Sequence, residues 1–119
     1  MPGRLTTHVL DTAQGRPAAG VAIELWRLGP GGARTLLARV ATNADGRTNA
    51  PLLADGALLA GEYELVFEVG AYFAAQGLLQ PGPPFLGQVP VRFGIAAPDA
   101  HYHVPLLVSP WAYSTYRGS

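Results

Sequence analysis

The chain has 119 residues, which is enough for one domain with one hydrophobic core and too few for two domains of common size. Its eight basic and eight acidic side chains cancel, so the sequence lacks the positive field that nucleic acid or an anionic membrane surface would attract. It has no cysteine, which excludes disulfides, thiol nucleophiles and cysteine-ligated zinc.

Short segments of alternating apolar and polar residues predict strands along the whole chain. Between them lie turn formers such as Asp45 followed by Gly46, and the glycine and proline cluster over 81–84. Repeated short strands with glycine- and proline-rich turns predict an all-β sandwich or barrel. The predicted strands, in chain order, are 5–10, 21–28, 35–42, 62–69, 89–95, 103–109 and 112–117.

The segment EYELVFEV, from Glu62 to Val69, alternates most regularly. Its apolar face begins at Tyr63 and takes every second residue to Val69, whereas Glu62, Glu64 and Glu68 lie on the opposite face, which we expect to meet solvent. The stretch 71–76, AYFAAQ, predicts the one short helix, with Gly77 placed to end it.

The last nineteen residues, HYHVPLLVSPWAYSTYRGS, are unusually rich in polar chemistry. Alternation assigns Tyr102 and every second residue to Val108 to the core, and leaves His101, His103 and every second residue to Ser109 on the other face. Leucine, proline and histidine together on one sheet face suit contact with another subunit better than contact with water. We therefore expect the chemistry of this tail to lie at an interface between subunits.

The histidines are the main candidates for catalysis, and each has a plainer interpretation. His101 and His103 point the same way on a strand, as a base with its orienting partner would, or as two metal ligands would. His8 taken alone fits a packed strand residue as well as it fits a catalytic residue. The three histidines together are enough in number to form a three-histidine zinc site. No carboxylate stands at a recognisable ligand spacing nearby.

Arg47, in NADGRTNAP, follows a turn. It is either a solvated surface charge or a guanidinium that grips an anionic or carbonyl-rich substrate. Ser109, Ser114 and Thr115 are alternative nucleophiles if a histidine activates one of them. The sequence contains neither a GxSxG elbow nor a phosphate-binding glycine loop.

Three segments together carry a family resemblance: LTTHVLDTAQGRPAAGV (5–21), NADGRTNAPLL (43–53) and the tail that ends in YRGS. In this order they resemble the signatures of the 5-hydroxyisourate hydrolases, the transthyretin-like enzyme family of urate breakdown. YRGS is the most specific part, because the transthyretins, which carry hormones on the same fold, lack it. The resemblance covers nearly the whole chain, so we expect one transthyretin-like domain over 1–119.

The resemblance implies a prealbumin-like β-sandwich of two four-stranded sheets with one short helix. It implies a homotetramer, a dimer of dimers, with active sites in the channel between dimers. The implied reaction is hydrolysis of the N1–C6 amide bond of 5-hydroxyisourate to 2-oxo-4-hydroxy-4-carboxy-5-ureidoimidazoline, with no cofactor and no metal. The implied catalytic residues are His8, Arg47 and His103; the substrate-binding residues are His8, Arg47, Tyr116, Arg117, Gly118 and Ser119; the supporting residues are His101 and Ser114.

Within this resemblance a histidine takes a proton from water, and either His8 or His103 fills that role. Two other classes of function stay open: a carrier that binds an apolar small molecule in the channel, and a structural module whose tail only covers a sheet edge. No apolar run approaches the roughly 20 residues that cross a bilayer. The first residues, MPGRLTTHVLD, lack the features of a secretory signal, so we expect a cytoplasmic protein unless the chain is a trimmed mature form.

Overall fold

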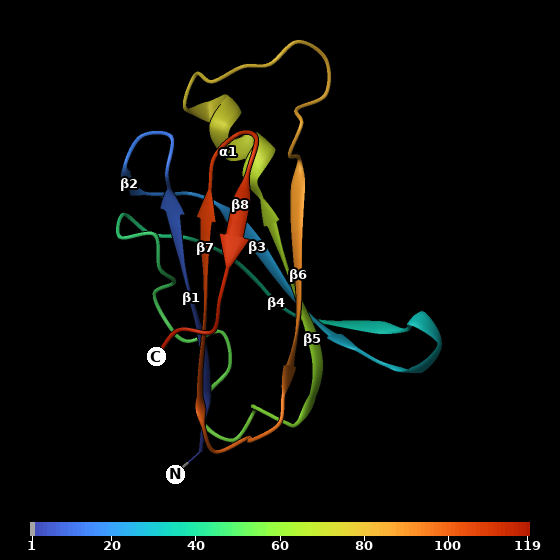
Figure 1. Ribbon diagram of the computed structural model, residues 1–119. Helices are drawn as coiled ribbons and strands as arrows, with labels where there is room; N and C mark the ends of the chain where they lie inside the picture. Colours follow the sequence, from blue (N-terminus) through green and yellow to red (C-terminus); the bar gives the residue numbers. More distant parts are fainter. Residues whose placement is uncertain (1) are drawn as a thin grey trace.

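A computed structural model describes residues 2–119 as two four-stranded sheets and one α-helix (Figure 1). The first sheet has the order β2-β1-β7-β8, and the second has the order β4-β3-β5-β6. This arrangement confirms the predicted sandwich of two four-stranded sheets with one short helix. The elements are β1 (Arg4–Asp11), β2 (Arg16–Pro17), β3 (Ala22–Leu28), the 3-10 helix η1 (Pro30–Gly32), β4 (Arg34–Ala41), β5 (Gly61–Glu68), α1 (Val69–Ala75), β6 (Gln88–Ile95), β7 (His101–Val108) and β8 (Tyr113–Thr115).

The core lies between the two sheets and is filled by alternate residues of their strands. Leu5 and Val9 of β1 are fully buried, as is Leu106 of β7. Tyr63 and Phe67 of β5 meet them from the second sheet and are also fully buried. The alternation in the sequence therefore predicts correctly which face of β5 and β7 turns inward.

The helix α1 begins at Val69, two residues before its predicted start, and ends at Ala75. Val69, Tyr72 and Phe73 are its buried residues, and their spacing of three and four is that of one helical face. Val69 therefore belongs to the helical pattern and not to the strand before it. Gly77 follows with φ of 84°, a left-handed conformation that ends the helix as predicted. The helix has seven residues, and nowhere in residues 2–119 is there a helix with the length and apolar character to span a membrane.

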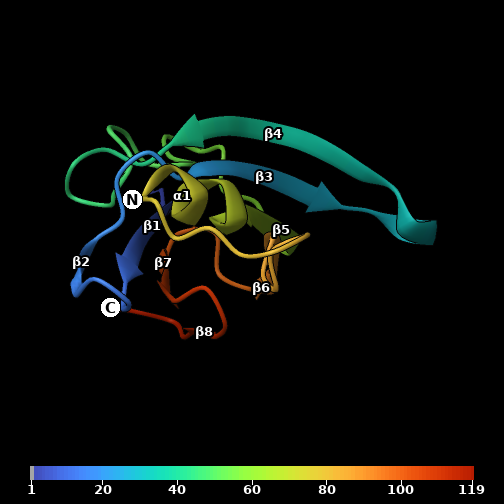
Figure 2. The same ribbon diagram turned by 90° about the horizontal axis from the view of Figure 1, so that it is seen from above.

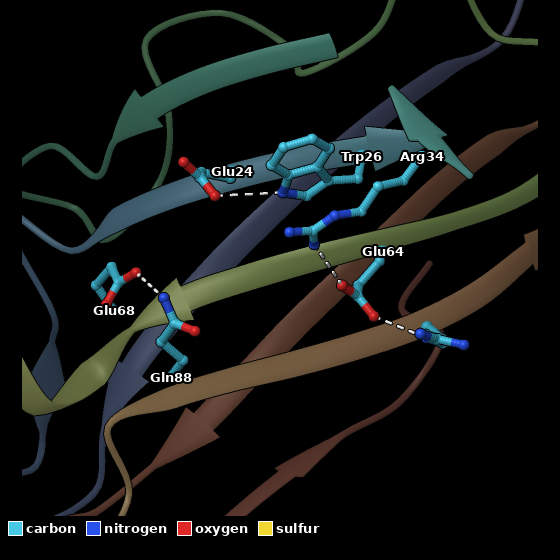
Figure 3. A network of polar contacts seen from close by, with 7 residues as sticks. Glu24, Trp26, Arg34, Glu64, Glu68 and Gln88 are labelled. Atoms are coloured by element: carbon cyan, nitrogen blue, oxygen red, sulfur yellow. Dashed lines mark hydrogen bonds and ion pairs between the residues drawn. The ribbon is translucent and has the colours of Figure 1, made fainter. Parts of the chain in front are cut away.

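The prediction that Glu64 faces solvent is wrong, because this side chain is only 6% exposed. β5 lies inside its sheet, between β3 and β6, so long side chains from other strands cover its outer face. Arg92 places Nε 2.7 Å from Oε2 of Glu64, and Arg34 places Nη1 3.5 Å from Oε1 (Figure 3). The Arg34 guanidinium also lies 4.0 Å from the ring centre of Trp26. Alternation correctly assigns Glu64 to the outer face but does not show what covers that face.

Two further departures concern the first sheet. No strand was predicted between 5–10 and 21–28, but Arg16 and Pro17 form β2 and pair with the end of β1. β8 is shorter than its predicted range, since it ends at Thr115. Beyond β8 the chain crosses β7 and ends beside β1 (Figure 1), and the hairpin of β3 and β4 projects away from this region (Figure 2).

Candidate active site

The three histidines lie on the outer face of the first sheet, on β1 and β7. These strands are parallel neighbours, and their register places Arg4 beside His101, Thr6 beside His103 and His8 beside Pro105. Core residues occupy the opposite face of both strands, so burial of the apolar face presents the polar side chains outward. Residues almost 100 positions apart in sequence thereby become neighbours.

Arg47 is brought to this face by a tight turn. The side-chain Oδ1 of Asn43 accepts hydrogen bonds from the backbone N–H of Asp45 at 2.9 Å and of Arg47 at 3.2 Å. Gly46 has φ of 74°, and a Cβ there would lie 2.4 Å from the carbonyl oxygen of Val9, so only glycine fits. The turn therefore lies tightly against β1 and pairs Arg47 with His8 in an antiparallel bridge.

His8 is held by the same turn. Its Nε2 lies 2.9 Å from the carbonyl oxygen of Asp45. A carbonyl oxygen only accepts, so Nε2 of His8 carries the hydrogen and Nδ1 of the neutral ring keeps its lone pair. Burial lowers the pKa of His8 below its ordinary value, and the positive charge of Arg47 lowers it further. His8 is thus a neutral ring with a defined tautomer at pH 7.

His103 is the second neutral imidazole. Burial lowers its pKa most, the positive charge of Arg47 lowers it further, and His101 and His8 add to the effect when they are protonated. Its Nδ1 lies 2.8 Å from Oγ1 of Thr6, and Nε2 of His101 lies 2.9 Å from the same oxygen. Among residues 2–119 no hydrogen bond reaches Nε2 of His103, so this nitrogen is the one available to a ligand.

A pocket of about 330 Å³, called here the histidine pocket, opens on this face. Its walls are residues of β1 and β7, the segment 47–51 and the C-terminal residue, and they include Arg47, His101, His103 and Ser119. His8 pairs with Arg47 in the bridge but is not among the residues that line this pocket. The structure thus gathers a cation, two imidazoles and the chain terminus around one cavity of small-molecule size.

The rest of the tail divides between two places. The backbone N–H of Gly118 donates to the carbonyl oxygen of His103 at 2.8 Å, which holds the terminus against the pocket. Tyr116 and Arg117 line a different cavity of about 340 Å³, and the Arg117 guanidinium lies 4.0 Å from the ring centre of Tyr102. Nη2 of Arg117 donates to the backbone carbonyl oxygen of His101 at 3.4 Å, but neither Tyr116 nor Arg117 is among the residues that line the histidine pocket. Their substrate-binding role stays a prediction.

The alternative chemistries have less geometric support. The described residues contain no cluster of three or more His, Asp or Glu side chains placed to hold a metal ion. Thr115 donates its hydroxyl to the carbonyl oxygen of Pro105, and the Ser109 hydroxyl caps the turn to Ala112. Ser114 pairs with Leu107 on β7, farther along the same sheet, so its supporting role also stays a prediction.

The sequence analysis overlooked Thr6 and Asn43. Asn43 shapes the turn that carries Arg47, and an asparagine two residues before an aspartate is a recognisable turn signal. Thr6 contacts both histidines of β7. Its position two residues before His8 places it on the same strand face, but its partners depend on the β1–β7 register.

Comparisons with known proteins add evidence that is independent of the geometry of the site. Residues 5–118 match the model of the HIUase/Transthyretin family. A 5-hydroxyisourate hydrolase of Mesorhizobium japonicum is 64% identical over 117 residues, which cover 98% of this chain and 93% of that protein.

Two solved structures are similar over nearly all of this chain. The structure of Klebsiella pneumoniae 5-hydroxyisourate hydrolase has a TM-score of 0.80 and 39% identity, and the match covers 98% of this chain and 99% of that one. An (S)-allantoin synthase has a TM-score of 0.93 and 52% identity over 99% of this chain. This chain spans only 44% of the length of that synthase.

Proposed function

The chain belongs to the HIUase/Transthyretin family, and we propose that the histidine pocket is where it hydrolyses 5-hydroxyisourate. The observation that carries this assignment is the placement of neutral His103 and the Arg47 cation on one cavity. Hydrolysis of a ring amide needs a base for water and a positive group for the developing oxyanion, and these two side chains supply both. The reaction converts 5-hydroxyisourate to 2-oxo-4-hydroxy-4-carboxy-5-ureidoimidazoline.

In the proposed mechanism, His103 is the base. Its free Nε2 takes a proton from water as the water oxygen attacks the C6 carbonyl carbon. The guanidinium of Arg47 stabilises the negative charge that develops on the carbonyl oxygen. The N1–C6 bond then breaks, and the proton on His103 passes to N1, which regenerates the neutral imidazole. The reaction consumes one water molecule, whose oxygen stays on C6 and whose transferred proton ends on N1.

His8 has a different part in this proposal. Its Nε2 hydrogen is occupied by the carbonyl oxygen of Asp45, so it is poorly placed to give that proton to the leaving nitrogen. Because His8 does not line the histidine pocket, its proposed part is to hold the turn that carries Arg47, through the hydrogen bond from its Nε2 to the carbonyl oxygen of Asp45. The structure therefore favours His103 over His8 as the base, a choice that the sequence left open.

The proposal includes a homotetramer with sites at the interface between dimers. The outer face of β1 and β7 bears Leu10 and Leu107 next to the histidines, and Trp111 is 65% exposed nearby along the chain. A mixed apolar and polar face of this kind supports burial against another subunit. Subunits facing one another across it would close the open side of the histidine pocket. A cytoplasmic location stays a prediction from the sequence.

The experiment that tests the function follows the ultraviolet decay of 5-hydroxyisourate, generated in place by uricase acting on urate. The protein is first passed through a chelating resin, and the spontaneous decay rate is subtracted. Accelerated decay that survives chelation supports a metal-independent hydrolase. Decay at the spontaneous rate would exclude the enzyme and leave a carrier or structural module on this fold.

The lowered pKa values predict the pH dependence of the reaction. A base works only when deprotonated, and burial together with the Arg47 charge places the pKa of His103 below the ordinary 6.5. We therefore expect kcat/KM to stay level through neutral pH and to fall only as the pH drops below about 6.5. The profile of kcat/KM, corrected for spontaneous decay at each pH, measures this. A falling limb centred above 6.5 would contradict the assignment.

Gly118 gives a prediction about the tail. A Cβ at this position would lie 2.6 Å from Cδ2 of His103, so Gly118→Ala must displace either the imidazole or the terminus. Because displacement of a catalytic group by about 1 Å can cost about 100-fold, we expect kcat to fall by about 10- to 100-fold with the fold intact. Gly87→Ala is the control, since a Cβ there meets nothing within 4 Å. Equal rates for both variants would show that the tail does not hold His103.

A further inference from the structure

The hydroxyl of Thr6 joins two histidines of β7 through one oxygen atom. Oγ1 lies 2.8 Å from Nδ1 of His103 and 2.9 Å from Nε2 of His101, and the two rings are 6.3 Å apart, centre to centre. The β1–β7 register places Thr6 directly beside His103, so the contact follows from strand pairing. Thr6 is half-buried, whereas His101 is exposed.

The number of hydrogens at this junction restricts its arrangement. A hydroxyl has one hydrogen to donate and lone pairs with which to accept, whereas a neutral imidazole has one N–H and one accepting nitrogen. When the hydroxyl gives its hydrogen to one ring, the other ring must give an N–H to the hydroxyl. The protonated nitrogen of His103 is therefore linked to the direction of the Thr6 hydroxyl.

We propose that Thr6 is a positioning residue that fixes the tautomer of His103: its oxygen accepts Nδ1–H of His103, and its hydrogen is donated to Nε2 of His101. This inference rests on the proposed function, because it explains how His103 keeps a lone pair on Nε2 for water. The opposite direction would place hydrogen on Nε2 and leave His103 unable to act as a base there.

The surroundings of His103 favour the proposed direction. The Cδ2 edge of the ring packs against Gly118 and Nδ1 meets Thr6, so Nε2 is the nitrogen left toward the pocket that Arg47 also lines. A lone pair is the negative end of a neutral imidazole, and an N–H is the positive end. The lone pair of Nε2 is therefore better placed near the guanidinium than an N–H would be.

The same arrangement serves the reaction as it proceeds. When Nε2 of His103 takes the proton of water, Nδ1–H still donates to Oγ1 of Thr6, and that bond becomes charge-assisted and stronger. The hydroxyl keeps its own hydrogen on Nε2 of His101 throughout. Thr6 thus stabilises the cationic ring without any rearrangement of hydrogens.

The test reads the tautomer directly, by nuclear magnetic resonance of ¹⁵N-labelled histidine side chains in the intact protein without substrate. We expect Nδ1 of His103 to be protonated and its Nε2 to be bare in the wild-type protein. Thr6→Val, which removes the hydroxyl and keeps the shape, should give His103 a mixture of tautomers. Thr6→Val should also lower kcat by about tenfold with little change in KM. Thr6→Ser, which keeps the hydroxyl, should restore the single tautomer of His103 and the wild-type kcat.

Thr12→Val is the matched control. The hydroxyl of Thr12 also crosses from the β1 end to β7, where it donates to the carbonyl oxygen of Val108, but it touches no histidine. We expect this variant to leave the tautomer and kcat unchanged. A wild-type His103 protonated on Nε2 would overturn the inference. So would a Thr6→Val variant with unaltered tautomer and rate, or equal losses in Thr6→Val and Thr12→Val.

The tautomer measurement needs no substrate, so it separates this inference from the proposed function. A protein that shows the expected ring protonation but does not hydrolyse 5-hydroxyisourate would sink the function alone. A protein that hydrolyses the substrate with His103 in the other tautomer would sink the Thr6 inference alone.

Discussion

Replacing His103 with alanine is expected to lower kcat for 5-hydroxyisourate by about 100- to 10,000-fold, the usual contribution of a positioned general base. The variant loses the one imidazole that lines the pocket with an available Nε2. The fold should persist, because the side chain lies on the outer face of β7 and leaves the core unchanged. Rates from ultraviolet decay, with circular dichroism and thermal unfolding on the same sample, measure both effects.

Two additional measurements make the His103→Ala result specific. Free imidazole added to the variant should restore part of the rate, because it supplies the missing base in the space left by the side chain. His8→Ala is the informative companion, since the proposal gives His8 only a hydrogen-bonding role and predicts a smaller loss. If His8→Ala lowered kcat more than His103→Ala, the role of base would have to be assigned to His8 instead of His103.

Replacing Arg47 with alanine is expected to lower kcat/KM by about 100- to 1,000-fold, as removal of one donor to a developing oxyanion does. A second effect follows from charge. Arg47 lowers the pKa of both His8 and His103, so its removal should raise them, and the acidic limb of the pH profile should move to higher pH. The rate and the pH profile together separate a role at the site from general damage.

Arg39→Ala is the matched control for Arg47→Ala. Arg39 is an exposed arginine that pairs with Glu24 on the other sheet, so its loss should leave both the rate and the profile unchanged. Arg47→Lys keeps the charge without the planar fork and should give an intermediate rate with an unshifted pH profile. An Arg47→Ala variant with wild-type kcat/KM would remove this residue from the mechanism.

Local sequence patterns predicted the strands well where burial is one-sided. Burial alternates along the whole of β1, because one face of the strand meets the core, and β7 departs from this alternation only at Pro105. The start of α1 was misplaced because Val69 fits both the end of a strand pattern and the first position of a helical face. The two-residue β2 is too short for any periodicity to be visible.

The sequence predicted some residues of the candidate site better than others. Sequence resemblance singled out His8, Arg47 and His103, and the structure places all three on one region of the first sheet. The sequence resemblance could not show that Tyr116 and Arg117 line a separate cavity within the chain. After β8 the tail is held by tertiary contacts, namely the Arg117 guanidinium over the ring of Tyr102 and the hydrogen bond from Gly118 to His103, and no local pattern in the sequence indicates these partners.

The sequence by itself determined the strand faces, the fold class and the family, because these depend on alternation and motifs that lie within short stretches of chain. Only the tertiary structure decided that Glu64 is buried and that Thr6 joins His101 to His103. The physical reason is the same in both cases: each depends on which strands lie side by side and in what register. A threonine hydroxyl contacts two imidazoles, more than 90 residues away, only when strand pairing brings them within hydrogen-bonding distance of it.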